Sequence, residues 1–463
     1  EPLAEAVTLV KSANRMADLL HSHSRAWRQI WEQCDIQIKT GNGAAQLRLR
    51  LHVFHLLQTV HHSVGADVGV PPRGWHGESY RGHIMWDELF IFPYINLRMP
   101  RVTRALLLYR YRRLREARSA AREAGFKGAM FPWQSGSNGR EESQQIHLNP
   151  MSGRWIADVS WRQRHIGAAI CYNIWQYYEA TGDADFLTNY GAELFFEIAR
   201  FWSSLARRRK DGRYEIDGVM GPDEFHTAYP TADPSAPVGI NNNAYTNVMV
   251  AWLMARAFDV LDRIPSAKRQ RLCERLGLKD EEFDLWRDIG CNLFIPLQDD
   301  GIISQFEGYA DLEEFDLNGY RKRYGSLQRL DRILEKEGED LNRFKISKQA
   351  DVLMLFYLFS REEIEETFDR LGYAFTPDQI PKNSHYYVER TSHGSSLSWM
   401  THAWVLARAD RESSWQLALR ALANDVENLQ HGTVSEGIHL GAMAGTVDLM
   451  QRCYTGIEMR DGV

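Results

Sequence analysis

Hydrophobic residues recur at helical spacing through most of this chain. Between residues 161 and 180 they fall on one face of a helix: Ile166, Ala169, Ile170, Ile174 and Tyr177. Residues 186–205 repeat the pattern. Gly182 suits the left-handed end of the first helix and Asp183 the N-cap of the second, so we expect an antiparallel pair joined by a short turn.

The same spacing predicts about a dozen helices in all. Besides the two above, they are expected near residues 8–33, 45–62, 101–124, 245–262, 322–337, 348–371, 393–408, 413–430 and 438–452. Strand signal is scarce: residues 213–216 alternate before the turn pair Asp217-Gly218 and predict one arm of a small hairpin.

Long loops rich in Gly, Pro, Asn and Trp separate these helices, and such loops commonly carry function. They span residues 65–88, 125–160, 209–243 and 372–392. The sequence shows no repeat of fixed period and no linker. It therefore predicts one all-α domain over residues 1–463, with minor β-hairpins.

Composition narrows the class of protein. Hydrophobic residues make up 44% and charged residues 25%, as in ordinary globular proteins, and no apolar run approaches the roughly 18 residues of a membrane helix. Lys and Arg total 55 against 61 for Asp and Glu, a net charge of −6, which argues against a nucleic-acid partner. The 5 cysteines form no C-x-x-C pair, so we expect a reducing, cytoplasmic location.

Glu224 is the first candidate for chemistry. It lies in Gly221–His226, directly after the expected hairpin, and a carboxyl fixed on a turn suits general acid catalysis. The alternative is a turn whose carboxylates only cap neighbouring backbone. The polar residues that follow offer amide groups that could bind sugar hydroxyls: Asn241, Asn242, Asn243, Tyr245 and Asn247.

Two later segments are candidate anion sites. In His393–Ser398, the hydroxyls of Ser395 and Ser396 stand with unpaired backbone N–H groups at a helix start, although either serine could serve only as an N-cap. Glu436-Gly437 precedes a run of small residues and could add a backbone donor and a second carboxylate. Close helix packing through glycine is the alternative.

Two polar pairs could hydrogen-bond a sugar. They are Lys348-Gln349, at the start of a predicted helix, and Asp87-Glu88, which follow Trp86 in an aromatic loop that also bears His83. Each pair alone also fits a surface or capping role. Four histidines lack an H-E-x-x-H pattern and predict no metal site: His52, His55, His61 and His62.

Taken together, these segments resemble glycoside hydrolase family 65, which contains inverting disaccharide phosphorylases acting on trehalose, kojibiose, nigerose and maltose. The resemblance runs in the family's order through nearly the whole chain. It rests on residues 77–88, 128–133, 221–226 with 243–247, 348–351, 393–398 and 436–446.

The resemblance implies a fold and roles for residues. The family fold is an (α/α)6 barrel, in agreement with the dozen helices expected independently. Glu224 corresponds to the general acid. The glucosyl-holding groups correspond to Trp86, Asp87, Lys348 and Gln349, and the phosphate cradle to His393, Ser395, Ser396 and the backbone at Gly437. No metal or cofactor is implied beyond inorganic phosphate as co-substrate.

The implied reaction is an inverting phosphorolysis. Glu224, kept protonated by partial burial, would donate its proton to the glycosidic oxygen while phosphate attacks the anomeric carbon from the opposite face. A trehalose-like or kojibiose-like α-glucoside would yield β-glucose 1-phosphate. Two alternatives stay open: an inverting hydrolase with Glu436 as base, and a sugar-binding scaffold without catalysis.

The family pattern also bears on the organisation of the chain. Family members carry an N-terminal β-sandwich and a small C-terminal β piece that have no counterpart in this sequence. We therefore expect a catalytic domain, with residues 1–40 as linker-like helices. A homodimer is left open.

Overall fold

Six helices of the described residues close into an inner ring. In the computed structural model these residues are 2–13, 15–39, 43–60, 64–75, 77, 79–230, 236–349, 351–429 and 433–459, so His61 and His62 lie outside them. Each helix of the ring packs on the next, and the last packs on the first. The ring consists of α4 (Glu88–Arg98), α7 (Ile166–Thr181), α10 (Ala244–Arg263), α15 (Leu353–Leu358), α18 (Ser396–Leu406) and α20 (Leu440–Asp448).

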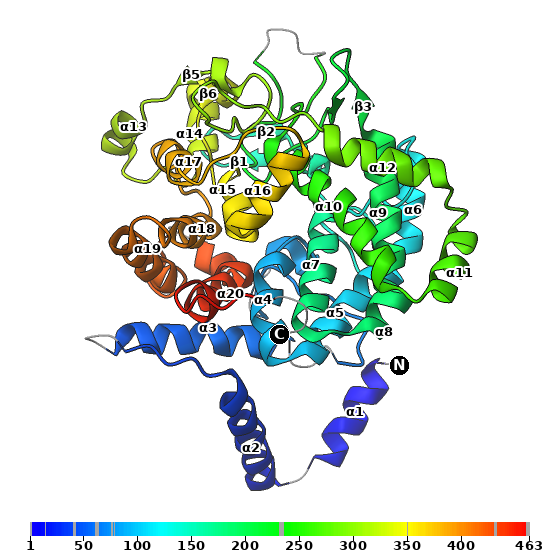
Figure 1. The fold of residues 1–463 in the computed structure, drawn as a ribbon. Helices are drawn as coiled ribbons and strands as arrows, with labels where there is room; N and C mark the ends of the chain where they lie inside the picture. Colours follow the sequence, from blue (N-terminus) through cyan, green and yellow to red (C-terminus); the bar gives the residue numbers. More distant parts are fainter. Residues whose placement is uncertain are drawn as a thin grey trace.

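An outer helix precedes each inner helix along the chain, and the two layers together form the predicted (α/α)6 barrel (Figure 1). The outer layer of the described residues consists of α3 (Ala44–Val60), α5 (Pro100–Arg112), α9 (Ala192–Leu205), α12 (Asp280–Asn292), α16 (Arg361–Arg370) and α19 (Arg411–Ala423). The all-α fold class predicted from the sequence is therefore confirmed.

Further helices decorate the barrel. They are α1 (Pro2–Ser12), α2 (Met16–Cys34), α6 (Leu114–Glu123), α8 (Ala184–Phe186), α11 (Ser266–Leu276), α13 (Leu317–Tyr324), α14 (Leu330–Glu337) and α17 (Gln379–Val388). Figure 1 shows α1 and α2 standing off the barrel below α3. No residue of α1 is buried, whereas Trp27 of α2 packs on Phe54 of α3 with 5.0 Å between ring centroids.

Strands are short and paired two by two. β1 (Ile146–Asn149) pairs antiparallel with β2 (Arg154–Ala157), and β3 (Arg207–Arg208) antiparallel with β4 (Tyr214–Glu215). β5 (Glu313–Glu314) runs parallel to β6 (Phe344–Lys345). Short 3-10 segments span Ser79–Gly82, Ser160–Arg162, Tyr309–Asp311, Leu341–Arg343 and Thr433–Glu436, and π-turns span Leu187–Gly191 and Leu449–Cys453.

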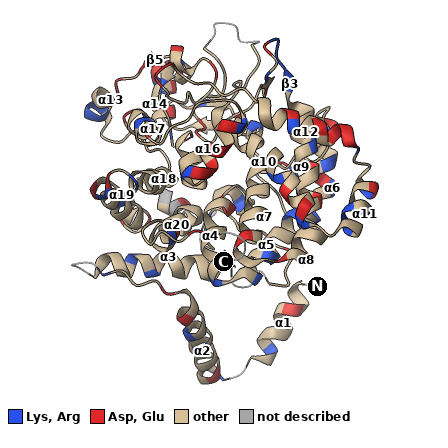
Figure 2. Cartoon of the chain, viewed as in Figure 1, with Lys and Arg blue, Asp and Glu red and all other residues tan. Residues whose placement is uncertain are grey.

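Charge and burial separate the two layers. Outer helices such as α12 and α16 carry many acidic and basic residues, whereas α18 and α20 are nearly free of them (Figure 2). All of α20 is buried, and Ser396–Val405 of α18 are buried too.

Within the described part of the chain, no helix combines the length and the apolar composition needed to span a bilayer.

The structure confirms some local predictions and corrects others. Gly182 ends α7 with φ +64°, and the Asp183 side chain accepts a hydrogen bond from Phe186 N at 2.9 Å, as predicted. The predicted hairpin exists, but its partner strand precedes it, because the chain reverses at Gly212 with φ +88° and not at Asp217-Gly218. Four helices were missed: α4, α11, α12 and α17, the last inside an expected loop.

Candidate active site

The predicted site residues lie at one end of the barrel, where the inner helices begin. Asp87 immediately precedes α4, Lys348 and Gln349 lie just before α15, and Ser395 is the N-cap of α18. The start of each inner helix presents free backbone N–H groups and the positive end of the helix dipole. This arrangement favours an anionic ligand at this mouth of the barrel.

The loop that carries Glu224 is held rigidly. Glu224 itself has φ +64°, a left-handed backbone that is uncommon for a residue with a side chain. Next to it, the buried Asp223 carboxylate accepts hydrogen bonds from Lys348 N at 2.6 Å and from His226 Nδ1 at 3.1 Å. The Gln349 side-chain amide donates to the carbonyl of Pro222. Gln349 therefore braces the acid loop in this structure.

Two side chains contact the Glu224 carboxylate directly. The Lys348 ammonium binds Oε2, and Gln163 Nε2 donates to Oε1 at 3.3 Å. Gln163 is oriented in turn by His165 Nε2, which lies 3.1 Å from its Oε1. Burial lowers the pKa of Lys348, but Glu224 and Tyr80 outweigh that effect, so its pKa lies above the usual value.

The expectation that partial burial keeps Glu224 protonated stays a prediction. Its side chain is 26% exposed and forms an ion pair with the Lys348 ammonium group.

The predicted phosphate cradle adjoins this ion pair. Gly394 N donates to Lys348 O at 2.7 Å, and a Cβ at Gly394 would lie 2.9 Å from Lys348 Cγ, so the lysine side chain runs against this loop. His393 has φ +56°, and its Nδ1 lies 2.9 Å from Ser398 Oγ. Burial, with His402 and two arginines nearby, holds the pKa of His393 well below its usual value.

The two serines have different local roles. Ser395 Oγ accepts a hydrogen bond from Leu397 N at 3.3 Å and caps α18, which was the structural alternative considered for it. Ser396 Oγ lies 2.6 Å from His439 Nδ1. The other ring nitrogen, Nε2, lies 3.0 Å from Oδ1 of the buried Asp87. His439 thus joins the predicted glucosyl-binding carboxylate to the predicted phosphate loop.

The backbone of Gly437 and the side chain of Glu436 both lie against Arg73. Gly437 N donates within a turn to Val434 O at 3.0 Å, and Gly437 O accepts from Arg73 Nη1 at 2.7 Å. The Glu436 side chain is 53% exposed and faces Arg73 at 3.8 Å. Among the described residues, no hydrogen bond or ion pair joins Glu436 to Glu224.

Trp86 belongs to a buried aromatic cluster under this mouth. Its ring centroid lies 5.2 Å from that of His165, 5.3 Å from Phe90 and 6.0 Å from Trp133. Burial lowers the pKa of His165 to about 3, so its ring stays neutral. Trp86 is 4% exposed and can offer a ligand only a small part of its surface.

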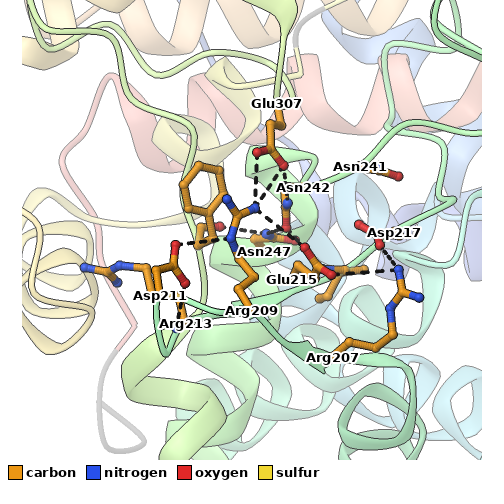
Figure 3. A network of polar contacts seen from close by, with 12 residues as sticks. Arg207, Arg209, Asp211, Arg213, Glu215, Asp217, Asn241, Asn242, Asn247 and Glu307 are labelled. Atoms are coloured by element: carbon orange, nitrogen blue, oxygen red, sulfur yellow. Dashed lines mark hydrogen bonds and ion pairs between the residues drawn. The ribbon is translucent and has the colours of Figure 1, made fainter.

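The asparagines that follow the acid loop are structural. Figure 3 shows Asn242 and Arg209 meeting at Glu307, with contacts of 2.7 and 3.1 Å. Asn242 Oδ1 also accepts from Ile216 N, and Asn247 Nδ2 donates to Phe294 O at 2.7 Å. Asn242, Asn243 and Asn247 are fully buried. The expectation that these amides bind sugar hydroxyls is therefore wrong for Asn242, Asn243 and Asn247.

Sequence reasoning missed Gln163, His165 and His439. His165 and His439 directly precede inner helices, and Gln163 lies three residues before α7, so the helix starts themselves were the signal that could have identified them. His52 is a buried core residue whose pKa burial lowers to about 4. In the described ranges, no cluster of three His, Cys, Asp or Glu residues could hold a metal ion.

Another opening lies elsewhere on the barrel. A cavity of about 770 Å³ is lined by Trp175 of α7, Tyr357 of α15 and Trp404 of α18, close to where these inner helices end. It contains none of the predicted site residues. The chemistry-bearing residues therefore gather at the opposite mouth.

Comparison with known proteins agrees with this geometry. Residues 50–448 match the family described as "Glycosyl hydrolase family 65 central catalytic domain". An uncharacterized glycosyl hydrolase of Mycobacterium tuberculosis H37Rv is 54% identical over 97% of this chain. Trehalose 6-phosphate phosphorylase of Lactococcus lactis is 36% identical and kojibiose phosphorylase of Halothermothrix orenii 32%, each over 97% of this chain.

This chain covers only part of these relatives: 34%, 57% and 55% of their respective lengths. A solved structure from the human microbiome, provisionally assigned as a kojibiose phosphorylase, matches with a TM-score of 0.81 at 23% identity. It covers 100% of this chain and 63% of its own. That likeness supports the barrel fold.

Proposed function

The chain belongs to glycosyl hydrolase family 65, and from that membership and the site geometry we propose that it catalyses phosphorolysis of an α-glucosyl disaccharide, with inversion, to β-glucose 1-phosphate and a free sugar. The observation that carries the proposal is the contact between Glu224 and Lys348, whose side chain runs against the His393–Ser396 loop. This contact supports the proposal of an acid and an anion site in one mouth of the barrel. Relatives named as trehalose, trehalose 6-phosphate and kojibiose phosphorylases support this reaction class.

In the proposed mechanism, Glu224 donates a proton to the glycosidic oxygen as phosphate attacks the anomeric carbon from the other face. Phosphate is itself an anionic nucleophile, so no protein base is required. The start of α18 and the Ser396 hydroxyl would hold it. Trp86 and Asp87 would hold the glucosyl unit.

Phosphate also offers an explanation of how Glu224 obtains its proton. In the structure, the Lys348 ammonium pairs with Glu224. A phosphate anion beside the loop that Lys348 crosses would compete for this ammonium and weaken the ion pair. Loss of that charge partner favours the protonated carboxyl that general acid catalysis needs.

The decisive experiment compares sugar cleavage with and without phosphate. A panel of α-glucosyl disaccharides is incubated in phosphate and in a phosphate-free buffer, and glucose 1-phosphate is measured, with the anomer of the product read by NMR. We expect β-glucose 1-phosphate only when phosphate is present. Equal cleavage in both buffers would establish a hydrolase, and an α-anomer would contradict inversion.

Glu224→Gln tests the acid within the same assay. The amide has the same shape but cannot donate the required proton, so turnover should fall by roughly 100-fold or more. Arg361→Gln, on outer helix α16, is the control and should keep full activity. Undiminished turnover of Glu224→Gln would remove this residue from the mechanism.

The cytoplasmic location, the homodimer and the linker role of residues 1–40 stay predictions.

A further inference from the structure

Two arginines flank, in the sequence, the glutamine that contacts Glu224. Gln163 lies between Arg162 and Arg164 in the segment that leads into α7. This segment is fixed to the chain before the acid loop: Met220 N donates to Arg162 O at 3.1 Å, and Arg162 Nη1 donates to Gly218 O at 2.6 Å. The two guanidinium groups share the ring of Trp161, at 4.6 and 5.1 Å from its centroid.

Neither arginine has a carboxylate in ion-pair distance among the described residues. Arg162 Nε is buried without a hydrogen-bond partner there. The Arg164 side chain makes no hydrogen bond to the described chain, and none of its nitrogens is fully enclosed, so they are open to a ligand. The carboxylate acting on it, Glu141, already accepts from Trp133 N at 2.7 Å and Gln134 N at 3.1 Å.

Such a pair of uncompensated cations is costly to bury. Burial lowers the pKa of Arg162, and it lowers the pKa of Arg164 to about 10 with a further contribution from Arg162. Elsewhere in the barrel, a buried guanidinium has its counter-charge: Arg110 is paired with Glu88 at 3.0 Å. The missing anion beside Gln163 therefore points to a ligand.

The position of Gln163 indicates which part of the substrate this segment lies near. Lys348 contacts Oε2 of Glu224 and runs along the phosphate loop, whereas Gln163 contacts Oε1. In an inverting reaction, phosphate and the leaving sugar occupy opposite faces of the glucosyl ring. The Gln163 side of the acid is accordingly the side of the leaving sugar.

We propose that Arg162 and Arg164 form an anion subsite that binds a phosphoryl group on the leaving sugar, so that the substrate is a phosphorylated disaccharide. This inference rests on the phosphorolysis proposed above. Two guanidinium groups match the double negative charge of a phosphate monoester and can bind its oxygens with paired N–H donors. A single carboxylate, as in a uronic acid, would leave one charge unmatched.

The reverse reaction tests this without knowledge of the linkage. β-Glucose 1-phosphate is supplied with either glucose, glucuronate or glucose 6-phosphate, and released inorganic phosphate is measured. The acceptor hydroxyl attacks the anomeric carbon and inorganic phosphate leaves, while the 6-phosphoryl group is untouched. We expect kcat/KM to be at least roughly 10-fold higher for glucose 6-phosphate than for the other two acceptors.

Variants assign that preference to the arginines. In Arg164→Leu, the ratio of kcat/KM for glucose 6-phosphate over glucose should fall by roughly 10- to 100-fold, and Arg164→Lys should restore part of it. Arg361→Gln, remote from Gln163, should leave the ratio unchanged. Circular dichroism confirms that each variant is folded.

The possible failures are distinguishable. If glucose or glucuronate is used as well as glucose 6-phosphate, or if the preference survives in Arg164→Leu, the anion subsite is refuted and phosphorolysis stands. If no acceptor releases phosphate but the disaccharide panel yields glucose 1-phosphate, the subsite is again refuted. If neither assay shows turnover, the proposed function fails and the subsite with it.

Discussion

Replacing Gly441 with alanine should displace Asp87 and impair catalysis. A Cβ at residue 441 would lie 2.4 Å from Asp87 Oδ1, whereas ordinary contact begins at 3.4 Å. The carboxylate must therefore move by about 1 Å, and its contact with His439 Nε2, now 3.0 Å, is lost or distorted. A misplacement of about 1 Å near reacting groups costs roughly 100-fold in rate.

Gly445→Ala is the matched control on the same helix. Its Cβ would lie 2.5 Å from Met400 Cε, the flexible end of a side chain that can turn aside. Both substitutions increase helix propensity by about 1 kcal/mol, so propensity does not distinguish them. The only marked difference is what each new methyl group meets.

The assay is the kcat/KM for glucose 1-phosphate formation, accompanied by thermal unfolding followed by circular dichroism. We expect a loss of roughly 100-fold in Gly441→Ala and near-normal activity in Gly445→Ala. A folded Gly441→Ala enzyme with full kcat/KM would show that the position of Asp87 does not matter. Equal losses in both variants would attribute the effect to crowding of α20 and not to Asp87.

Three further predictions concern the supporting residues. Arg110→Met leaves the buried Glu88 unpaired and should reduce the free energy of unfolding by about 3 to 5 kcal/mol, measured by urea titration. Adding Glu88→Leu should recover this loss, and a double variant without recovery would contradict the pairing. Gln163→Leu should lower kcat/KM roughly 10-fold and leave the KM for phosphate unchanged, because Gln163 contacts Glu224 and not the predicted phosphate cradle. A raised KM for phosphate would refute that placement. Burial lowers the pKa of His402 to about 4 from its usual 6.5, so the unfolded chain binds the extra proton between these values. Stability present above pH 6.5 is then lost as pH falls toward 4, and His402→Phe should flatten this fall in thermal midpoint.

Amphipathic spacing found most helices of both layers, but it missed α4 of the inner ring and α12 of the outer layer. The helix at Glu88–Arg98 was missed because seven of its first nine residues are apolar, and all nine are buried. Without a polar face, a helix gives no period of 3.6 residues. Pro93 within it weakens the helical signal further.

The acid candidate was accessible to sequence reasoning, but its environment was not. Glu224 could be proposed from its turn and motif. Its partners Gln163 and Lys348 are separated from it by 61 and 124 residues. Composition and local spacing carry no information on which distant loops meet.

The sequence by itself determined the helical class, the order of the motifs and the family they resemble, because propensity, caps and motif chemistry are local properties of the chain. Only the tertiary structure decided that the asparagines after the acid loop are enclosed, and that His439 joins Asp87 to Ser396. It also decided that the two arginines beside Gln163 have no carboxylate within ion-pair distance among the described residues. These features arise where the inner helices begin side by side. That convergence is created by packing the ring, and no single segment contains it.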